Sequence, residues 1–164
     1  MDVCQYSDKI LLEEHEIVEC GRLRCYRRPM AFSEEEIAYI RSQPLARLGT
    51  VDGSGQPDIA PVGFDWDGTY FYVGGVAWEK SRKFRNVVTG HTRVAFVFDD
   101  LASVDPWAPR FIRVYGTAEM VERTGLLGPG TYMQIKPETS WAGNLAGRPF
   151  GGSYGYAPPT RTTH

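Results

Sequence analysis

The sequence is poor in the residues that build metal sites and disulfides, and it has no long apolar run. Its 164 residues include only 3 Cys and 3 His. The cysteines are odd in number and form no CxxC pair, and the histidines show no ligand spacing, so we expect neither a disulfide framework nor a bound metal. No stretch approaches the roughly 18 apolar residues of a membrane span, and the first residues lack the pattern of a secretory signal. These absences predict a soluble, cytoplasmic protein that has no membrane partner.

An excess of basic charge is also missing. The formal net charge is -2, which argues against nucleic acid as a partner because such binders normally carry a basic surface. Catalytic patterns are missing as well: we find no nucleophilic triad and no carboxylate pair, and the glycines of residues 125–130 lack the lysine of a phosphate-binding loop. The sequence alone therefore identifies no catalytic residue. The positive charge that does gather, at residues 82–85, suits a small anionic ligand better than a polymer.

The chain is long enough for one domain that buries roughly two thirds of the surface exposed by its unfolded form. We expect an N-terminal extension over residues 1–31, in which 16–20 and 23–27 form a hairpin. The main domain is expected over residues 32–148. Residues 149–164 are rich in glycine and proline, so we expect a flexible C-terminal tail.

The main domain is expected to begin with a helix. Ser33 and Glu36 have the spacing of a capping box, and Phe32 and Ile37 have the spacing of a hydrophobic staple. Pro44 marks the end of the helix.

After this helix the pattern changes to short β-like runs separated by turns rich in glycine and aspartate. The expected strands are 45–51, 59–66, 70–73, 94–98, 111–119 and 131–136, with the first three forming a meander. A second, short helix carries residues 82–86; we expect Phe84, Val87 and Val88 on its apolar side and Gly90 at its stop. Six short strands with flanking helices predict a mainly β fold, an antiparallel six-stranded barrel, since closure removes exposed edges.

The most informative segment is Ser81-Arg82-Lys83-Phe84-Arg85-Asn86, which follows an aromatic strand and Gly74-Gly75. A phosphate would accept charge-assisted hydrogen bonds from Arg82 and Lys83 and further bonds from Ser81 and Asn86. The alternative is a solvated basic helix face. The two glycines favour a site because they let a flat ligand approach the backbone.

Two further motifs suit a ring-shaped ligand. Pro61, in Ala60-Pro61-Val62-Gly63, cannot donate to a strand ladder, which leaves neighbouring backbone groups free; a structural edge proline is the alternative. Trp141 follows a late strand, where its indole would cover an aromatic ligand or simply fill a core or an interface.

The order of these motifs resembles the split β-barrel flavin and deazaflavin oxidoreductases, the superfamily that includes pyridoxamine 5'-phosphate oxidase. The resemblance spans roughly residues 34 to 141, and its Lys83-Phe84-Arg85-Asn86 portion is similar to the branch that uses coenzyme F420. The matching pieces are Leu48-Gly49-Thr50-Val51, Gly55-Gln56-Pro57, Ala60-Pro61-Val62, Ser81 to Asn86 and Arg93-Val94-Ala95-Phe96.

The resemblance implies a split β-barrel of Greek-key type and a role for each motif. Ser81, Arg82, Lys83 and Asn86 would hold the cofactor phosphate, and the backbones of Pro61, Val62 and Gly63 and of Val73, Gly74 and Gly75 would line its ring. The family is usually a homodimer with the cofactor between subunits, so Trp141 would come from the opposing chain. Its continuation, Ala142-Gly143-Asn144, departs from the family's commoner Trp-Gly ending.

The function implied is hydride transfer from reduced F420 to an electron-poor C=C bond of an enone-type substrate, such as a polycyclic secondary metabolite. The cofactor carries that chemistry, so a catalytic triad is not required. The resulting enolate would take its proton from water or from a tyrosine such as Tyr72. The alternatives are an FMN-dependent oxidase or reductase, because Ser81-Arg82-Lys83 also resembles the phosphate site of pyridoxamine phosphate oxidases, and a flavin- or haem-binding protein without turnover.

Overall fold

The computed structural model describes residues 18–20, 23–25, 32–75, 77–150 and 157–164. The chain divides into two compact units, Met1–Met30 and Ala31–His164. In the first unit β1 (Val18–Cys20) pairs antiparallel with β2 (Leu23–Cys25), with Glu19 opposite Arg24. This confirms the predicted hairpin for the paired residues, whereas its turn lies outside the described part of the chain. The expected domain limits remain a prediction.

The second unit begins with α1 (Glu34–Ser42), which starts where the capping box predicted. The Ser33 hydroxyl accepts a hydrogen bond from the Glu36 backbone N–H, and the Glu36 carboxylate accepts one from the Ser33 backbone N–H. Such a cap stabilises a helix by about 1 kcal/mol. Phe32 is buried and Ile37 packs against the core, as the staple predicted. The helix therefore docks on the barrel through residues that the sequence identifies.

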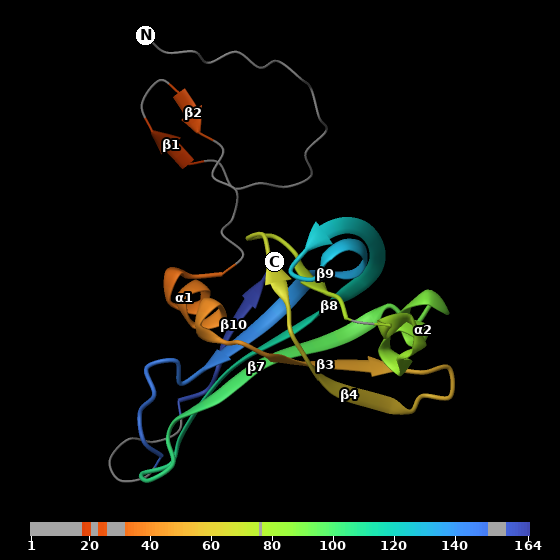
Figure 1. Cartoon of the computed structure of the whole chain (residues 1–164). Coiled ribbons are helices and arrows are strands. Elements are labelled where there is room, and N and C mark those ends of the chain that lie inside the picture. The colour runs from red at the N-terminus through yellow and green to blue at the C-terminus, as the bar shows by residue number, and fades with distance from the viewer. Residues whose placement is uncertain (1–17, 21–22, 26–31, 76, 151–156) are drawn as a thin grey trace. The chain divides into compact units, whose positions relative to one another are not determined.

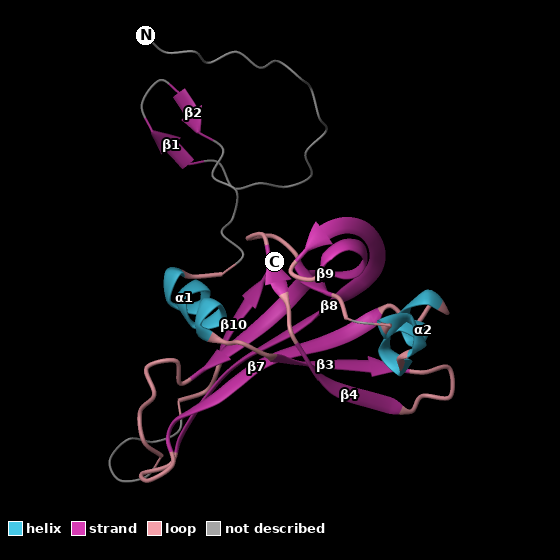
Figure 2. Ribbon diagram, viewed as in Figure 1, coloured by secondary structure: helices cyan, strands magenta, loops and turns pink. Residues whose placement is uncertain are grey.

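The remaining elements are mostly strands (Figure 2). In chain order they are β3 (Ala46–Val51), β4 (Pro57–Val62), β5 (Asp65–Trp66), β6 (Phe71–Val73), the 3-10 turn η1 (Trp78–Lys80), α2 (Arg82–Val88), β7 (Arg93–Ser103), β8 (Ala108–Gly125), β9 (Gly128–Gly143) and β10 (Thr160–Thr163). β3 runs from the side of α1 to the side of α2 (Figure 1). None of the described helices is long and apolar enough to cross a membrane.

All the pairings in the main sheet are antiparallel, in the order β4-β3-β7-β8-β9-β6-β5 with β10 added to β9. The two ends of this path, β4 and β5, are consecutive in the chain and are separated only by Gly63 and Phe64. The path therefore closes through the chain, which confirms the mainly β, split-barrel fold class. Aromatic rings fill its interior; Phe71, Phe96 and Phe98 pack with ring centroids 5.1 to 5.4 Å apart.

The strand predictions need correction in where strands divide and in how long they are; β7, for example, runs over Arg93–Ser103 and not only over 94–98. The expected strand 59–66 is two strands, because the chain leaves β3 at Gly63 and pairs with β6 instead. β8 and β9 are much longer than expected. They pair continuously from Phe111, which lies opposite Gly143, to Gly125, which lies opposite Gly128, although this stretch of β9 contains prolines and glycines that usually weaken strands. Long-range pairing thus overrides local propensity in this ribbon.

The end of the chain and the second helix differ from expectation in detail. Residues 160–163 form β10 against β9, so the prediction of a flexible tail is wrong for this segment. Its three threonines favour a strand, whereas the prediction relied on the glycines and prolines that precede them. In α2, Phe84 packs against the core and Val87 is buried, but Val88 is 52% exposed, contrary to prediction. Gly90 ends the helix region with φ +97°, as expected.

Candidate functional site

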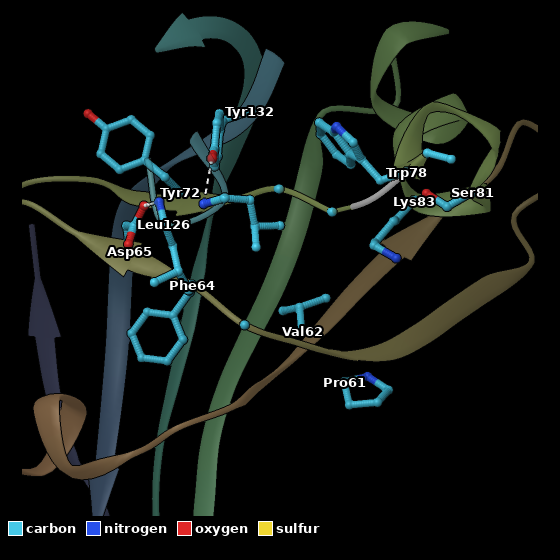
Figure 3. Close-up of a pocket in the computed structure, with 15 residues that line it drawn as sticks. Pro61, Val62, Phe64, Asp65, Tyr72, Trp78, Ser81, Lys83, Leu126 and Tyr132 are labelled. Atoms are coloured by element: carbon cyan, nitrogen blue, oxygen red, sulfur yellow. Dashed lines mark hydrogen bonds between the residues drawn. The ribbon is translucent and has the colours of Figure 1, made fainter. Parts of the chain in front are cut away.

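A pocket of about 460 Å³ lies among the exit of β4, the segment after β6, the start of α2 and the β8–β9 turn (Figure 3). Its volume falls in the range of small-ligand sites. Figure 3 shows Ser81 and Lys83 on one side of the pocket and Asp65, Leu126 and Tyr132 on the other. The lining residues are Pro61, Val62, Gly63, Phe64, Asp65, Tyr72, Gly74, Gly75, Ala77, Trp78, Ser81, Lys83, Leu126, Leu127 and Tyr132.

The end of β4 forms a wall with an open backbone. Pro61 lies opposite Arg47 on a strand that pairs only with β3 among the described strands, so it holds the edge position that the sequence predicted. Edge strands tolerate proline, because one side of such a strand has no ladder to complete. A Cβ at Gly63 would meet nothing within 4 Å. A flat ligand has access to the backbone at this wall, to which Val62 also belongs.

Gly74 and Gly75 line the pocket for a different reason from the one expected. A Cβ at Gly74 would lie 2.6 Å from Cε1 of Tyr132, and one at Gly75 would lie 2.9 Å from Cβ of Trp78. These glycines therefore make room for the protein's own rings. Trp78 is held in place because its indole N–H donates to the Thr131 carbonyl at 3.1 Å. The preceding residue, Val73, is fully buried in the core and does not line the pocket, contrary to the predicted role of its backbone.

The cationic side of the pocket combines Ser81 and Lys83. Ser81 caps α2, where its hydroxyl oxygen accepts a hydrogen bond from the Phe84 N–H at 3.4 Å. Its own O–H remains able to donate to a ligand. Lys83 is half-buried in the pocket wall and makes no ion pair with the described residues. An uncommitted ammonium group beside a hydroxyl suits an anionic oxygen such as that of a phosphate.

Two other residues of the expected phosphate clamp do not reach the pocket. Arg82 is exposed and lies outside the lining. Asn86 is only 6% exposed, and its amide donates to the Thr50 hydroxyl at 2.9 Å. Helical spacing does place Asn86 one turn after Lys83, but α2 packs on β3, so its later turn faces the core. Asn86 ties the helix to the sheet, and the structure does not support a direct ligand contact for it within this chain.

Trp141 also lies outside this pocket. It belongs to β9, where the guanidinium carbon of Arg113 lies 4.4 Å and that of Arg161 5.9 Å from the Trp141 ring centroid. The Tyr115 ring packs edge-on at 4.9 Å. We call these four residues the Trp141 cluster. Such alternation of cations and rings stabilises the outer surface of the sheet through cation–π contacts.

Tyr72, the tyrosine expected as a proton donor, is committed within the protein. Its hydroxyl donates to Oδ2 of Asp67 at 2.7 Å, and the Arg123 guanidinium carbon lies 3.6 Å from its ring centroid. Burial and then the hydrogen bond to Asp67 raise the pKa of Tyr72 to about 12. A phenol held this way is a weak acid at neutral pH. The second tyrosine of the pocket, Tyr132, donates its hydroxyl proton to the Gly128 carbonyl at 2.9 Å.

Sequence reasoning missed the side of the pocket formed by Asp65, Leu126, Leu127 and Tyr132. These residues come from two strands, β5 and β9, and from the β8–β9 turn, which the long β8–β9 ribbon brings to the exit of β4. The available signal was Gly125-Leu126-Leu127-Gly128, which places two leucines where hairpin turns usually carry polar residues.

Comparison with known proteins identifies both a family and the fold. A family model described as pyridoxamine 5'-phosphate oxidase matches residues 32–140. The reductase of Streptomyces rimosus subsp. rimosus that acts on 5a,11a-dehydrotetracycline and 5a,11a-dehydrooxytetracycline is 41% identical over 99 residues, covering 58% of this chain and 68% of that enzyme.

Two solved structures share the fold at low sequence identity. A conserved hypothetical protein from Mycobacterium tuberculosis is 22% identical with a TM-score of 0.57, covering 79% of this chain and 96% of the other. A pyridoxamine 5'-phosphate oxidase homologue from Listeria innocua is 16% identical with a TM-score of 0.52, covering 66% of this chain and 95% of the other. At these identities the likeness establishes the fold alone.

Proposed function

This chain is an oxidoreductase of the pyridoxamine 5'-phosphate oxidase family, and we propose that it is a reductase of an electron-poor C=C bond in a polycyclic enone. The observation that carries the proposal is the division of the pocket. Lys83, which makes no ion pair with the described residues, lies on one side, and Leu126 and Leu127 lie beside Asp65 on the other. The relative that reduces dehydrotetracyclines supports the substrate class.

We propose coenzyme F420 as the cofactor, with FMN as the alternative. The residues present fit such a group: Gly63 leaves open space for a flat ring, and Lys83 and Ser81 offer donors for a phosphate. The similarity of Lys83-Phe84-Arg85-Asn86 to the deazaflavin branch favours F420. When bound in its reduced form, this cofactor supplies a hydride.

The protein's own part in the reaction is to bind, orient and exclude water. Lys83 and Ser81 would hold the anionic portion of the cofactor, while the backbone from Pro61 to Gly63 would line its ring. Tyr72 and Tyr132 donate their hydroxyl protons to protein acceptors, so we assign protonation of the product enolate to water. Because no charged protein group must change its protonation state for the hydride to transfer, we expect binding residues to dominate the mutational profile.

The proposal includes a homodimer and a cytoplasmic location. Trp141 lies outside the pocket lining of its own chain, so a role in cofactor binding requires a second subunit. The low number of cysteines favours a reducing compartment. Light scattering coupled to size exclusion will measure the mass. A dimer that Trp141→Ala dissociates supports the assignment, and a monomeric wild-type protein contradicts it.

The enzymatic proposal is tested by following oxidation of reduced F420 in the presence of 5a,11a-dehydrotetracycline. We expect enzyme-dependent oxidation that requires both compounds. The same assay with reduced FMN is the control for cofactor choice. Turnover with FMN alone would establish the FMN alternative, and ligand binding without turnover by either cofactor would indicate a binding protein.

A further inference from the structure

The turn between β8 and β9 presents two leucines to the pocket. Gly125 pairs with Gly128, which leaves Leu126 and Leu127 as a two-residue turn, and these side chains are 69% and 58% exposed. Turns of this length usually carry glycine, asparagine or aspartate, whose conformational freedom suits them. Two exposed leucines at such a position lose the burial that normally stabilises leucine in a fold. Their placement points to a ligand that covers them.

The turn is fixed in position by two hydrogen bonds to residues of the pocket (Figure 3). The Leu126 N–H donates to Oδ2 of Asp65 at 2.7 Å, and the Leu127 N–H donates to the Tyr132 hydroxyl oxygen at 3.0 Å. Asp65 lies 61 residues earlier in the chain, so this contact joins the turn to the exit of β4. The leucines are therefore held as a wall at a defined place.

Gly125, at the start of the turn, packs closely against the two side chains that hold the turn. A Cβ at Gly125 would lie 2.6 Å from Oδ2 of Asp65 and 2.8 Å from Tyr132. The glycine thus lets the carboxylate and the phenol reach the turn together. The same two side chains line the pocket, so one set of contacts shapes the pocket and positions the leucines.

Charge separates this side of the pocket from the side that suits the cofactor. Lys83 and Ser81 provide the donors on one side, and Asp65 provides a carboxylate on the other. An anionic phosphate is attracted to the first and repelled by the second. A planar molecule with a large apolar area is suited to this second side, where Leu126 and Leu127 offer apolar contact.

We propose that Leu126 and Leu127 form the substrate-binding wall of the pocket, that they contact the apolar ring surface of a fused polycycle, and that Asp65 is a positioning residue that acts through the Leu126 N–H. This proposal rests on the proposed function for the identity of the site, but it concerns the binding of the polycycle alone. Hydride transfer and cofactor choice do not enter it.

Tetracycline, the reduced counterpart of the dehydrotetracycline substrate of the relative, is a suitable probe because its binding requires no turnover. The full chain will be titrated with tetracycline, with and without saturating F420. We expect the double variant Leu126→Ser/Leu127→Ser to weaken tetracycline binding about ten-fold or more, since lost apolar contacts in a pocket have effects of this order. The affinity for F420 or FMN is expected to stay unchanged. Val104→Ser, at a valine that is 72% exposed on the β7–β8 turn, is the matched control.

The role of Asp65 is tested by comparing two variants. Asp65→Ala removes the acceptor and should weaken tetracycline binding, whereas Asp65→Asn retains an oxygen that can accept the Leu126 N–H and should restore most of it. Equal loss in both variants would show that the charge acts on the ligand and would overturn the positioning role.

The wall itself is overturned if wild-type protein does not bind tetracycline, if the double serine variant binds it as tightly as wild type, or if that variant loses cofactor affinity instead. A protein that binds tetracycline through this wall but oxidises neither reduced cofactor would retain the inference while contradicting the proposed function.

Discussion

The two sides of the pocket are built in different ways. The Lys83 side is local: Ser81, Lys83 and the cap of α2 lie within a few residues of one another. The Leu126–Leu127 side is non-local, because the hydrogen bond from Leu126 to Asp65 spans 61 residues. On the first side Lys83 makes no ion pair with the described residues, whereas the second side uses its polar groups to fix a turn. Residues on the Lys83 side can therefore be changed without disturbing the fold. Changes on the Leu126–Leu127 side are expected to alter both ligand binding and the packing of the protein.

The largest expected effect is a loss of cofactor affinity, without a loss of stability, on substitution of Lys83. Lys83→Ala should weaken cofactor binding by about 10- to 100-fold, because a charge-assisted hydrogen bond is worth about 1.5–3 kcal/mol. The apo melting temperature should stay close to that of wild type. Lys80→Ala is the matched control, since Lys80 is exposed and lies outside the pocket. Unchanged affinity in the Lys83 variant would show that the local side does not hold the cofactor.

Asn86 is expected to give the opposite result on the same helix. Asn86→Ala removes the bond to Thr50 and leaves a buried hydroxyl without its donor, which should cost about 1–3 kcal/mol of unfolding free energy. Cofactor affinity measured well below the melting temperature should be unchanged. Thr50→Val combined with Asn86→Ala will test the pairing, because the double variant should lose less than the sum of the single losses. If Asn86→Ala lost cofactor affinity without losing stability, Asn86 would contact the cofactor phosphate, as the sequence predicted.

These two residues also illustrate how far the sequence predicts the site. Spacing within α2 points to Lys83, and the structure places this residue in the pocket wall, because its environment is set by its own segment. The burial of Asn86 depends on how α2 packs against β3, which local spacing does not specify. The barrel class was predictable from strand patterns and turns, but the partner exchange at Gly63 and the long β8–β9 ribbon were not, because they arise from pairing between distant segments. The leucine wall was missed for the same reason.

Gly125→Ala tests the coupling on the non-local side. The added Cβ would overlap Asp65 and Tyr132 and displace the turn, at a cost of about 1–2 kcal/mol for overpacking at a partly exposed position. Tetracycline affinity should fall while cofactor affinity persists. Gly49→Ala is the control, because its Cβ would make only ordinary contacts of 3.6 Å with Ala95. Chemical denaturation will measure the stability of both variants, and titration will measure their affinity for tetracycline. If Gly125→Ala lost stability but kept its tetracycline affinity, the position of the turn would not determine binding.

The smallest expected effect is a pH dependence at Tyr72. An unfolded tyrosine loses its proton near pH 10, whereas in the folded protein burial and Asp67 raise the pKa of Tyr72 to about 12. The folded state therefore binds more protons in this window, and stability falls as pH rises through it. Below pH 10 the free energy of unfolding of wild type should exceed that of Tyr72→Phe by about 0.5–1 kcal/mol, the contribution of one hydrogen bond. This difference should shrink as the pH approaches about 12. A difference that grows with pH would contradict the assigned hydrogen bond.

The division of the pocket is measured by titrating Lys83→Ala and Leu126→Ser/Leu127→Ser each with F420 and with tetracycline. We predict that the lysine variant loses affinity for F420 alone and that the leucine variant loses affinity for tetracycline alone. Loss of both ligands in either variant, with the fold intact, would show that the two sides form a single undivided site.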